Sequence, residues 1–157
     1  MRQNLSITTV KKWAEDTNLE MVKVVEGKQG LICMMPMEDV LIPLIIRLDT
    51  GFIVFLVTVL LNVQNDVQLF KKALKLSATV PAKICLGRKD LMLVMDVPVH
   101  RGFSDKDFRD ALATLELVLG ECFWQLKSIA REIYKNNSTR EGSKDEFHWP
   151  KGLLCKN

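Results

Sequence analysis

The sequence predicts an α+β fold in which helices flank an antiparallel sheet, with the element order α-β-β-β-β-α-β-β-α. Three segments repeat apolar residues at three- and four-residue steps, as helices do when they bury one face. Between them lie short apolar runs separated by glycine-containing turns, a pattern typical of strands joined by hairpins. The sequence has 157 residues and is 48% hydrophobic, which is enough for one domain with a substantial core.

The first three elements are short. A helix is expected from Ser6 to Asp16, because its apolar residues fall on one helical face. Met21–Glu26 and Leu31–Met35 follow as strands around a glycine-containing turn, and Pro36 is expected to end the second strand.

An apolar segment from Val40 to Val63 follows, interrupted by Arg47, Asp49 and Gly51. A membrane helix needs about 20 continuous apolar residues, so the segment predicts two strands joined by a tight turn instead. The second of these, Phe52–Leu61, does not alternate with polar residues. Such a strand should be covered on both faces, by helices, by a partner chain or by a client.

One proline lies in this hairpin, and a helix follows it. Pro43 lacks an amide donor and is expected near the start of its strand or at a sheet edge. Asn65-Asp66 is a cap signal for a helix that ends near Ser77. We expect the buried stripe of this helix to consist of Val67, Phe70 and Leu74.

Another hairpin and the longest helix complete the fold. Ala82–Leu86 and Leu91–Val97 form the strands, and Ser104 caps the helix. The helix carries a coiled-coil-like apolar stripe made of Phe108, Leu112, Leu115, Leu119, Cys122, Leu126, Ile129 and Ile133. This stripe packs along the sheet of its own chain, or part of it meets a second subunit together with Trp124.

We expect one α+β domain over residues 1–135 and a flexible polar tail over residues 136–157. Four apolar residues return within the tail and either dock on the domain or form a short recognition segment: Phe147, Trp149, Leu153 and Leu154.

Composition argues against several classes of function. The net charge is only +3, and Lys71, Lys72 and Lys75 fit the solvated face of a helix, so we expect no nucleic acid and no membrane as partner. The cysteines lack paired metal-binding spacing, which predicts free thiols, no metal and no cofactor. The N-terminus has no signal-peptide pattern, which predicts a cytoplasmic location.

No motif for catalysis is visible, so no catalytic residue is assigned and we expect no enzyme. Asp105, Asp107 and Asp110 fit the start of a helix, whose dipole favours acidic residues. The competing hypothesis is a small-ligand-binding protein or enzyme with a pocket near His100, beside Arg101 and Asp96.

Three segments carry a resemblance to a known fold: VTVLLNVQNDVQLFKKALKLS, KICLGRKDLMLVMDVPVHRGFS and DFRDALATLELVLGECFWQL. Over roughly Ser6 to Ile133 the chain resembles the type III secretion chaperone-like fold, and within it the YbjN-like (sensory transduction regulator-like) proteins. The matching positions are Asn62, Asp96-Val97-Pro98-Val99 and Trp124. The resemblance implies a homodimeric, non-enzymatic α+β protein. Secretion chaperones of this fold bind an extended effector segment along apolar patches.

The function predicted from the sequence is non-enzymatic protein binding by a dimeric chaperone, adaptor or regulator. Its partner would be a protein client or a second copy of itself. The expected contact residues come from the apolar strand and the long helix: Phe52, Val54, Phe55, Val57, Val59 and Trp124.

Overall fold

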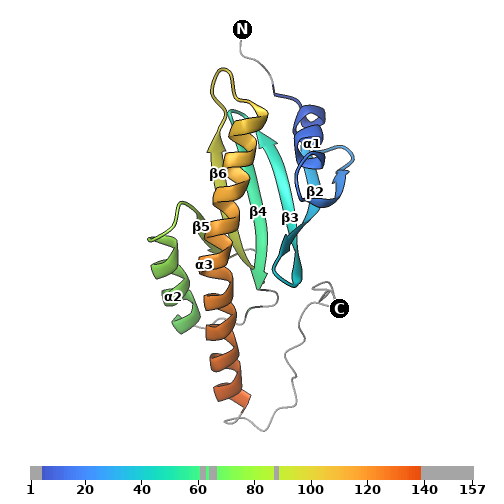
Figure 1. Ribbon diagram of the computed structural model, residues 1–157. Coiled ribbons are helices and arrows are strands. Elements are labelled where there is room, and N and C mark those ends of the chain that lie inside the picture. Colours follow the sequence, from blue (N-terminus) through green and yellow to red (C-terminus); the bar gives the residue numbers. More distant parts are fainter. Residues whose placement is uncertain (1–4, 61–62, 64–66, 87–88, 139–157) are drawn as a thin grey trace.

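The computed structural model describes residues 5–60, 63, 67–86 and 89–138 (Figure 1). Its elements follow the predicted order, and the α+β class is confirmed. The elements are α1 (Ile7–Glu15), β1 (Glu20–Val24), β2 (Gly30–Met37), β3 (Val40–Asp49), β4 (Phe52–Leu60), α2 (Val67–Ser77), β5 (Lys83–Leu86), β6 (Leu91–Pro98) and α3 (Asp105–Ser138).

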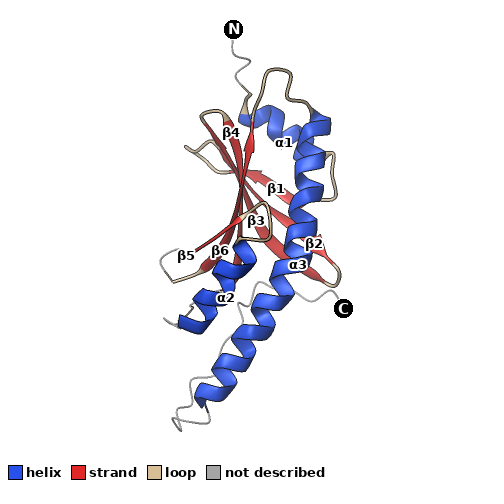
Figure 2. Ribbon diagram, turned by 90° about the vertical axis from the view of Figure 1, so that its left-hand side faces the viewer, coloured by secondary structure: helices blue, strands red, loops and turns tan. Residues whose placement is uncertain are grey.

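The six strands form one antiparallel sheet in the order β1-β2-β3-β4-β6-β5. Helices α1 and α3 lie on one side of this twisted sheet (Figure 2). Helix α3 crosses β4 and runs beyond the sheet, where α2 packs between its lower half and β5 (Figure 1). No described helix is long and apolar enough to cross a membrane.

The core lies between α3 and the side chains of β2, β3, β4 and β6 that point toward it. Phe55 of β4 and Phe108 of α3 meet with ring centroids 5.9 Å apart, and Trp13 of α1 lies 6.0 Å from Phe108. The predicted stripe of α3 is buried from Phe108 to Leu126, and Ile129 packs partly against the core. This stripe therefore lies along the sheet of its own chain.

The central hairpin forms where the sequence predicts it. Gly51 has a φ of 80°, which a residue with a side chain rarely adopts. Arg47 Nη2 lies 2.7 Å from Asp49 Oδ2, and both side chains remain largely exposed. The arginine in this apolar strand is thus paired beside the turn and reaches solvent.

Both prolines of the first hairpins lie inside strands, and the position of Pro36 corrects the sequence analysis. Pro36 belongs to β2 and pairs opposite Leu41, so it does not end the strand. Pro43 is inside β3, an inner strand of the sheet. The ladder between β3 and β4 is described only from Leu44 onward, so Pro43 lies beyond its end and needs no partner on that side.

The buried stripe predicted for α2 is also wrong. Leu69 and Ala73 are buried, whereas Val67 and Leu74 are 65% and 67% exposed and Phe70 is half-buried. The reason is that α2 has apolar residues on two adjacent faces, and only one faces β5 and α3. Spacing identifies such faces but does not tell which of them is covered.

Helix α3 continues to Ser138, beyond residue 135, where the sequence analysis expects the domain to end. The remainder of the predicted tail lies outside the described residues, including its apolar segment. Asn62 and the cap signal Asn65-Asp66 lie outside them as well.

Candidate functional site

One face of the sheet carries apolar side chains with no described helix over it. Successive residues of a strand point to opposite faces, so the neighbours of the core residues project away from α3. Ile32, Ile45, Leu56 and Val94 stand opposite one another in register and form one row across β2, β3, β4 and β6. Ile32 is 47% exposed and Ile45 is 38% exposed, and Leu56 and Val94 are half-buried.

We call this surface the open face. None of its residues belongs to the core between the sheet and α3. A second apolar set extends it on one side of the row, formed by Met34, Pro43 and Met92. Single exposed apolar residues are common on proteins, whereas large contiguous apolar patches are less common and often belong to interaction sites.

The apolar row ends in a lysine at each edge of the sheet. Lys23 of β1 pairs opposite Ile32, and Lys83 of β5 pairs opposite Val94. Lys83 Nζ lies 2.7 Å from Asp96 Oδ2, and this hydrogen bond raises the pKa of the lysine. The open face therefore has an apolar centre and a charged rim, the arrangement found in protein–protein interfaces.

The five β4 residues predicted to contact a partner divide between the two faces of this strand. Phe52 is 43% exposed, and Val54 points to the open face but is only 5% exposed. Phe55, Val57 and Val59 lie in the core under α3 and are at most 4% exposed. Their assignment as contact residues is corrected, because the folded chain itself covers them.

The sequence analysis missed the residues that make most of the open face. Ile32, Ile45 and Val94 belong to strands whose apolar runs also fail to alternate. That property was the available signal, since it predicts an apolar side chain on both faces of each strand.

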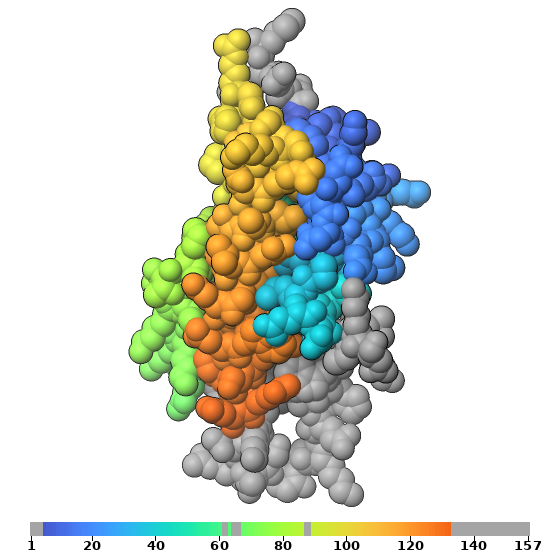
Figure 3. Space-filling view, in the orientation of Figure 1, coloured from blue at the N-terminus to red at the C-terminus, as the bar shows by residue number. Residues whose placement is uncertain are grey.

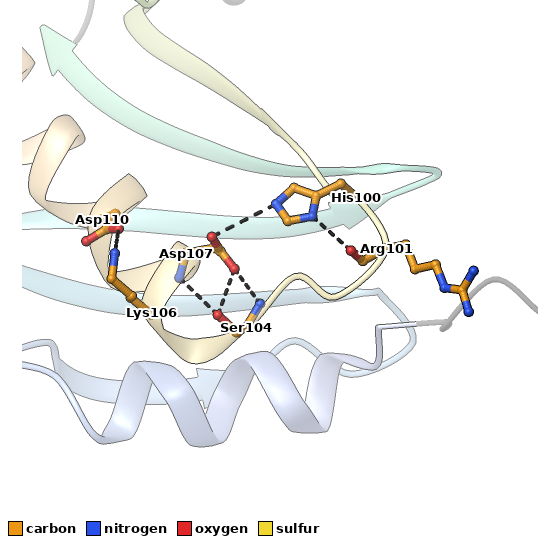
Figure 4. Close-up of polar contacts among 6 residues, drawn as sticks. All are labelled: His100, Arg101, Ser104, Lys106, Asp107 and Asp110. Carbon is orange, nitrogen blue, oxygen red and sulfur yellow. Dashed lines mark hydrogen bonds and ion pairs between the residues drawn. The ribbon is translucent and has the colours of Figure 1, made fainter.

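A polar cluster lies at the start of α3, in the region of the competing hypothesis (Figure 4). The Ser104 hydroxyl and backbone N–H both donate to Asp107 Oδ2, at 2.7 and 2.8 Å. The Asp107 N–H lies 3.4 Å from Ser104 Oγ, which completes a reciprocal helix cap. The bonds from the Ser104 hydroxyl and N–H lower the pKa of the Asp107 carboxyl.

The same cluster lacks the geometry of nucleophilic catalysis. A serine nucleophile donates to a histidine base, whereas the Ser104 hydroxyl donates to a carboxylate. His100 Nε2 is 3.9 Å from Asp107 Oδ1, and both side chains are on the surface. Arg101 points away from the cluster in Figure 4, and Asp96 is bound to Lys83. The arrangement acts as a helix cap.

Cysteines and metal ligands offer no further site among the described residues. Cys33 and Cys122 are buried, and loss of solvation raises the pKa of the Cys33 thiol to about 12. A thiol with a raised pKa is a poor nucleophile and a poor metal ligand at neutral pH. In the described part of the chain, no three histidine, cysteine or acidic residues are grouped to hold a metal.

Solved structures with a similar fold were found for this chain. The crystal structure of YbjN from E. coli, described as a candidate transcription regulator, superposes with a TM-score of 0.53 at 16% identity. The match covers 82% of this chain and 94% of YbjN. A chain from the HopA1–SchA chaperone–effector complex gives a TM-score of 0.47 at 16% identity, over 72% of this chain and 89% of that one. No protein-family model and no curated protein matches the sequence.

Proposed function

We propose that this protein is a non-enzymatic protein-binding module, a dimeric chaperone, adaptor or regulator of the YbjN-like kind, whose open face holds a client protein. The observation that carries the proposal is the apolar row of Ile32, Ile45, Leu56 and Val94, which has no described helix over it. We place this module in the cytoplasm, where its free thiols would stay reduced.

Burial of apolar surface supplies the driving force for this binding. Each Å² of apolar surface removed from water contributes about 25 cal/mol. Ile32 and Ile45 still expose 47% and 38% of their surface, so a client that covers them gains from that remainder. The strands hold these side chains in place, so little conformational entropy is lost when the client binds.

The face of the sheet is a better binding surface than its edges. An extended client can also add to the edge of a sheet through backbone hydrogen bonds. Here the register of β1 shifts between Glu20 and Lys23, and β5 has only 4 residues. Short or irregular edge strands accept an added strand poorly.

The charges around the open face favour a client with acidic residues beside its apolar ones. Lys23 borders the row on β1, and the chain as a whole carries a net charge of +3. Charged rims steer association and select partners more than they add affinity.

Replacement of Ile32 by Asp tests the proposal. This side chain is 47% exposed, so the variant should fold while placing a negative charge in the apolar row, at the end next to Lys23. Leu74→Asp is the matched control, because Leu74 is a 67% exposed apolar residue on α2, away from the open face. Circular dichroism establishes that both variants fold.

The measurement is affinity capture from the native cell extract, followed by cross-linking with an amine-reactive reagent. We expect one stoichiometric client with the wild type and with Leu74→Asp, cross-linked at Lys23 or Lys83, and its loss with Ile32→Asp. Equal capture of the same client by all three proteins would refute the assignment of the open face.

A further inference from the structure

The face of α3 that points away from the sheet carries a second apolar stripe. Ala113, Leu117, Gly120 and Trp124 follow one another at steps of four, three and four residues, and all four are exposed. Leu117 is 73% exposed and Trp124 is 38% exposed. We call this set the outer stripe. Helix α3 runs along the front of the molecule in Figure 3, with its outer side uncovered by the described residues.

Gly120 has no role that the protomer itself explains. Glycine inside a helix costs about 1 kcal/mol relative to alanine. A Cβ atom built at this position would meet no atom within 4 Å, so nothing in the protomer excludes a side chain. A glycine on an exposed apolar stripe lets the backbone of another helix approach closely.

Trp124 is held in place before any partner binds. Its ring makes an edge contact with Phe123, with centroids 5.2 Å apart. The Lys127 Nζ atom lies 5.3 Å from the Trp124 ring centroid and 4.2 Å from that of Phe123. Pre-positioned tryptophan residues often dominate the binding energy of an interface.

The outer stripe is complementary to itself when two copies of α3 run antiparallel. Gly120 and Glu121 lie at the middle of α3, so copies centred there overlap along the whole helix. In this register Leu117 of one copy faces Trp124 of the other, and Ala113 faces Ser128. A two-fold axis repeats each contact, as in most homodimers.

Charges beside the stripe fit the same register. Asp110 of one copy faces Arg131 of the other, and Arg109 faces Glu132, all on exposed positions. A parallel arrangement would instead place each of these residues against its own copy, like charge against like charge. Within one protomer Asp110 accepts a hydrogen bond from Lys106 at 2.6 Å, and Arg109 donates one to Asp105 at 2.9 Å and one to the backbone oxygen of Asp16 at 3.1 Å.

We infer that the outer stripe of α3 is the surface through which two copies of this chain associate, antiparallel and centred on Gly120 and Glu121. This inference rests on the dimeric state in the proposed function and specifies its interface. Since α3 and the open face lie on opposite sides of the sheet, the two open faces of the dimer point outward. Each dimer therefore presents two client surfaces.

Analytical ultracentrifugation of the full chain tests this interface. An interface formed by one helix from each copy is at the small end of stable interfaces. We therefore expect the protein to dimerise reversibly over protein concentrations of about 1 to 200 µM. Leu117→Glu places a charge against Trp124 of the partner and should raise the dissociation constant about ten-fold or more. Leu74→Glu is the matched control on α2 and should leave dimerisation unchanged.

A charge exchange tests the antiparallel register. In Asp110→Arg, the new arginine faces Arg131 of the other copy at both symmetry-related sites. This variant should raise the dissociation constant of the dimer about three- to ten-fold at low ionic strength. The double variant Asp110→Arg/Arg131→Asp restores opposite charges and should recover the wild-type dissociation constant. Absence of this recovery would overturn the register.

Two other results would overturn the inference while leaving client binding by the open face to its own test. One is a wild-type protein that stays monomeric throughout the concentration range. The other is a dimer that survives Leu117→Glu but dissociates with Leu74→Glu, which would place the interface on α2.

Discussion

Replacement of Phe55 by Ala measures how much the contact between β4 and α3 contributes to stability. Phe55 is 0% exposed, lies on a central strand and packs against Phe108, with tilted rings whose centroids are 5.9 Å apart. Removal of a buried phenylalanine costs about 3 to 5 kcal/mol, including the cavity it leaves. A domain of this size is stable by about 5 to 15 kcal/mol, so this single change should remove a large share of the total.

Urea denaturation, followed by circular dichroism, is the assay. The midpoint should fall strongly with an unchanged m-value, because the surface exposed on unfolding stays the same. The midpoint of thermal unfolding should fall by about 10 to 20 °C. Phe52→Ala on the same strand is the control. Its side chain is 43% exposed, so we expect a loss below about 1 kcal/mol.

Equal losses for Phe55→Ala and Phe52→Ala would refute the assignment of these residues to a covered and an open face of β4. A stable Phe55→Ala protein that had lost its client would instead place Phe55 at the binding surface, as the sequence analysis expects.

Four further predictions follow from local geometry. Gly120→Ala should stabilise the protomer by about 1 kcal/mol in urea denaturation, since a Cβ atom meets nothing within 4 Å there; a loss of stability would contradict this. Ser104→Ala should destabilise the protein by about 1 kcal/mol through loss of the cap. Because the pKa of Asp107 is lowered below its ordinary value of 3.8, its carboxylate stabilises the fold at neutral pH. The stability difference between wild type and Asp107→Asn should therefore be full above that pH and shrink as the pH falls below it; a difference independent of pH would exclude this account. The Cys33 thiol, with a pKa of about 12, should react with a thiol reagent at pH 8 only after unfolding, whereas Cys85 is partly exposed and should react in the native state.

Local signals in the sequence were sufficient to predict the order of the helices and strands. The turn at Gly51, the cap at Ser104 and the stripe that begins at Phe108 each depend on neighbours within a few residues. Backbone conformation and capping are decided over that distance, which is why the nine elements appear in the predicted order. The pairing of Arg47 with Asp49 is equally local.

Tertiary structure decided which apolar face is covered. In β4 both faces are apolar, so the sequence pattern could not separate Phe55, which α3 covers, from Leu56, which belongs to the open face. The same ambiguity reversed the expected burial of Val67 and Leu74 in α2. Periodicity shows that a face is apolar, but the docking of distant helices determines which face is removed from water. The surfaces left over by that docking are the open face and the outer stripe, to which we assign binding.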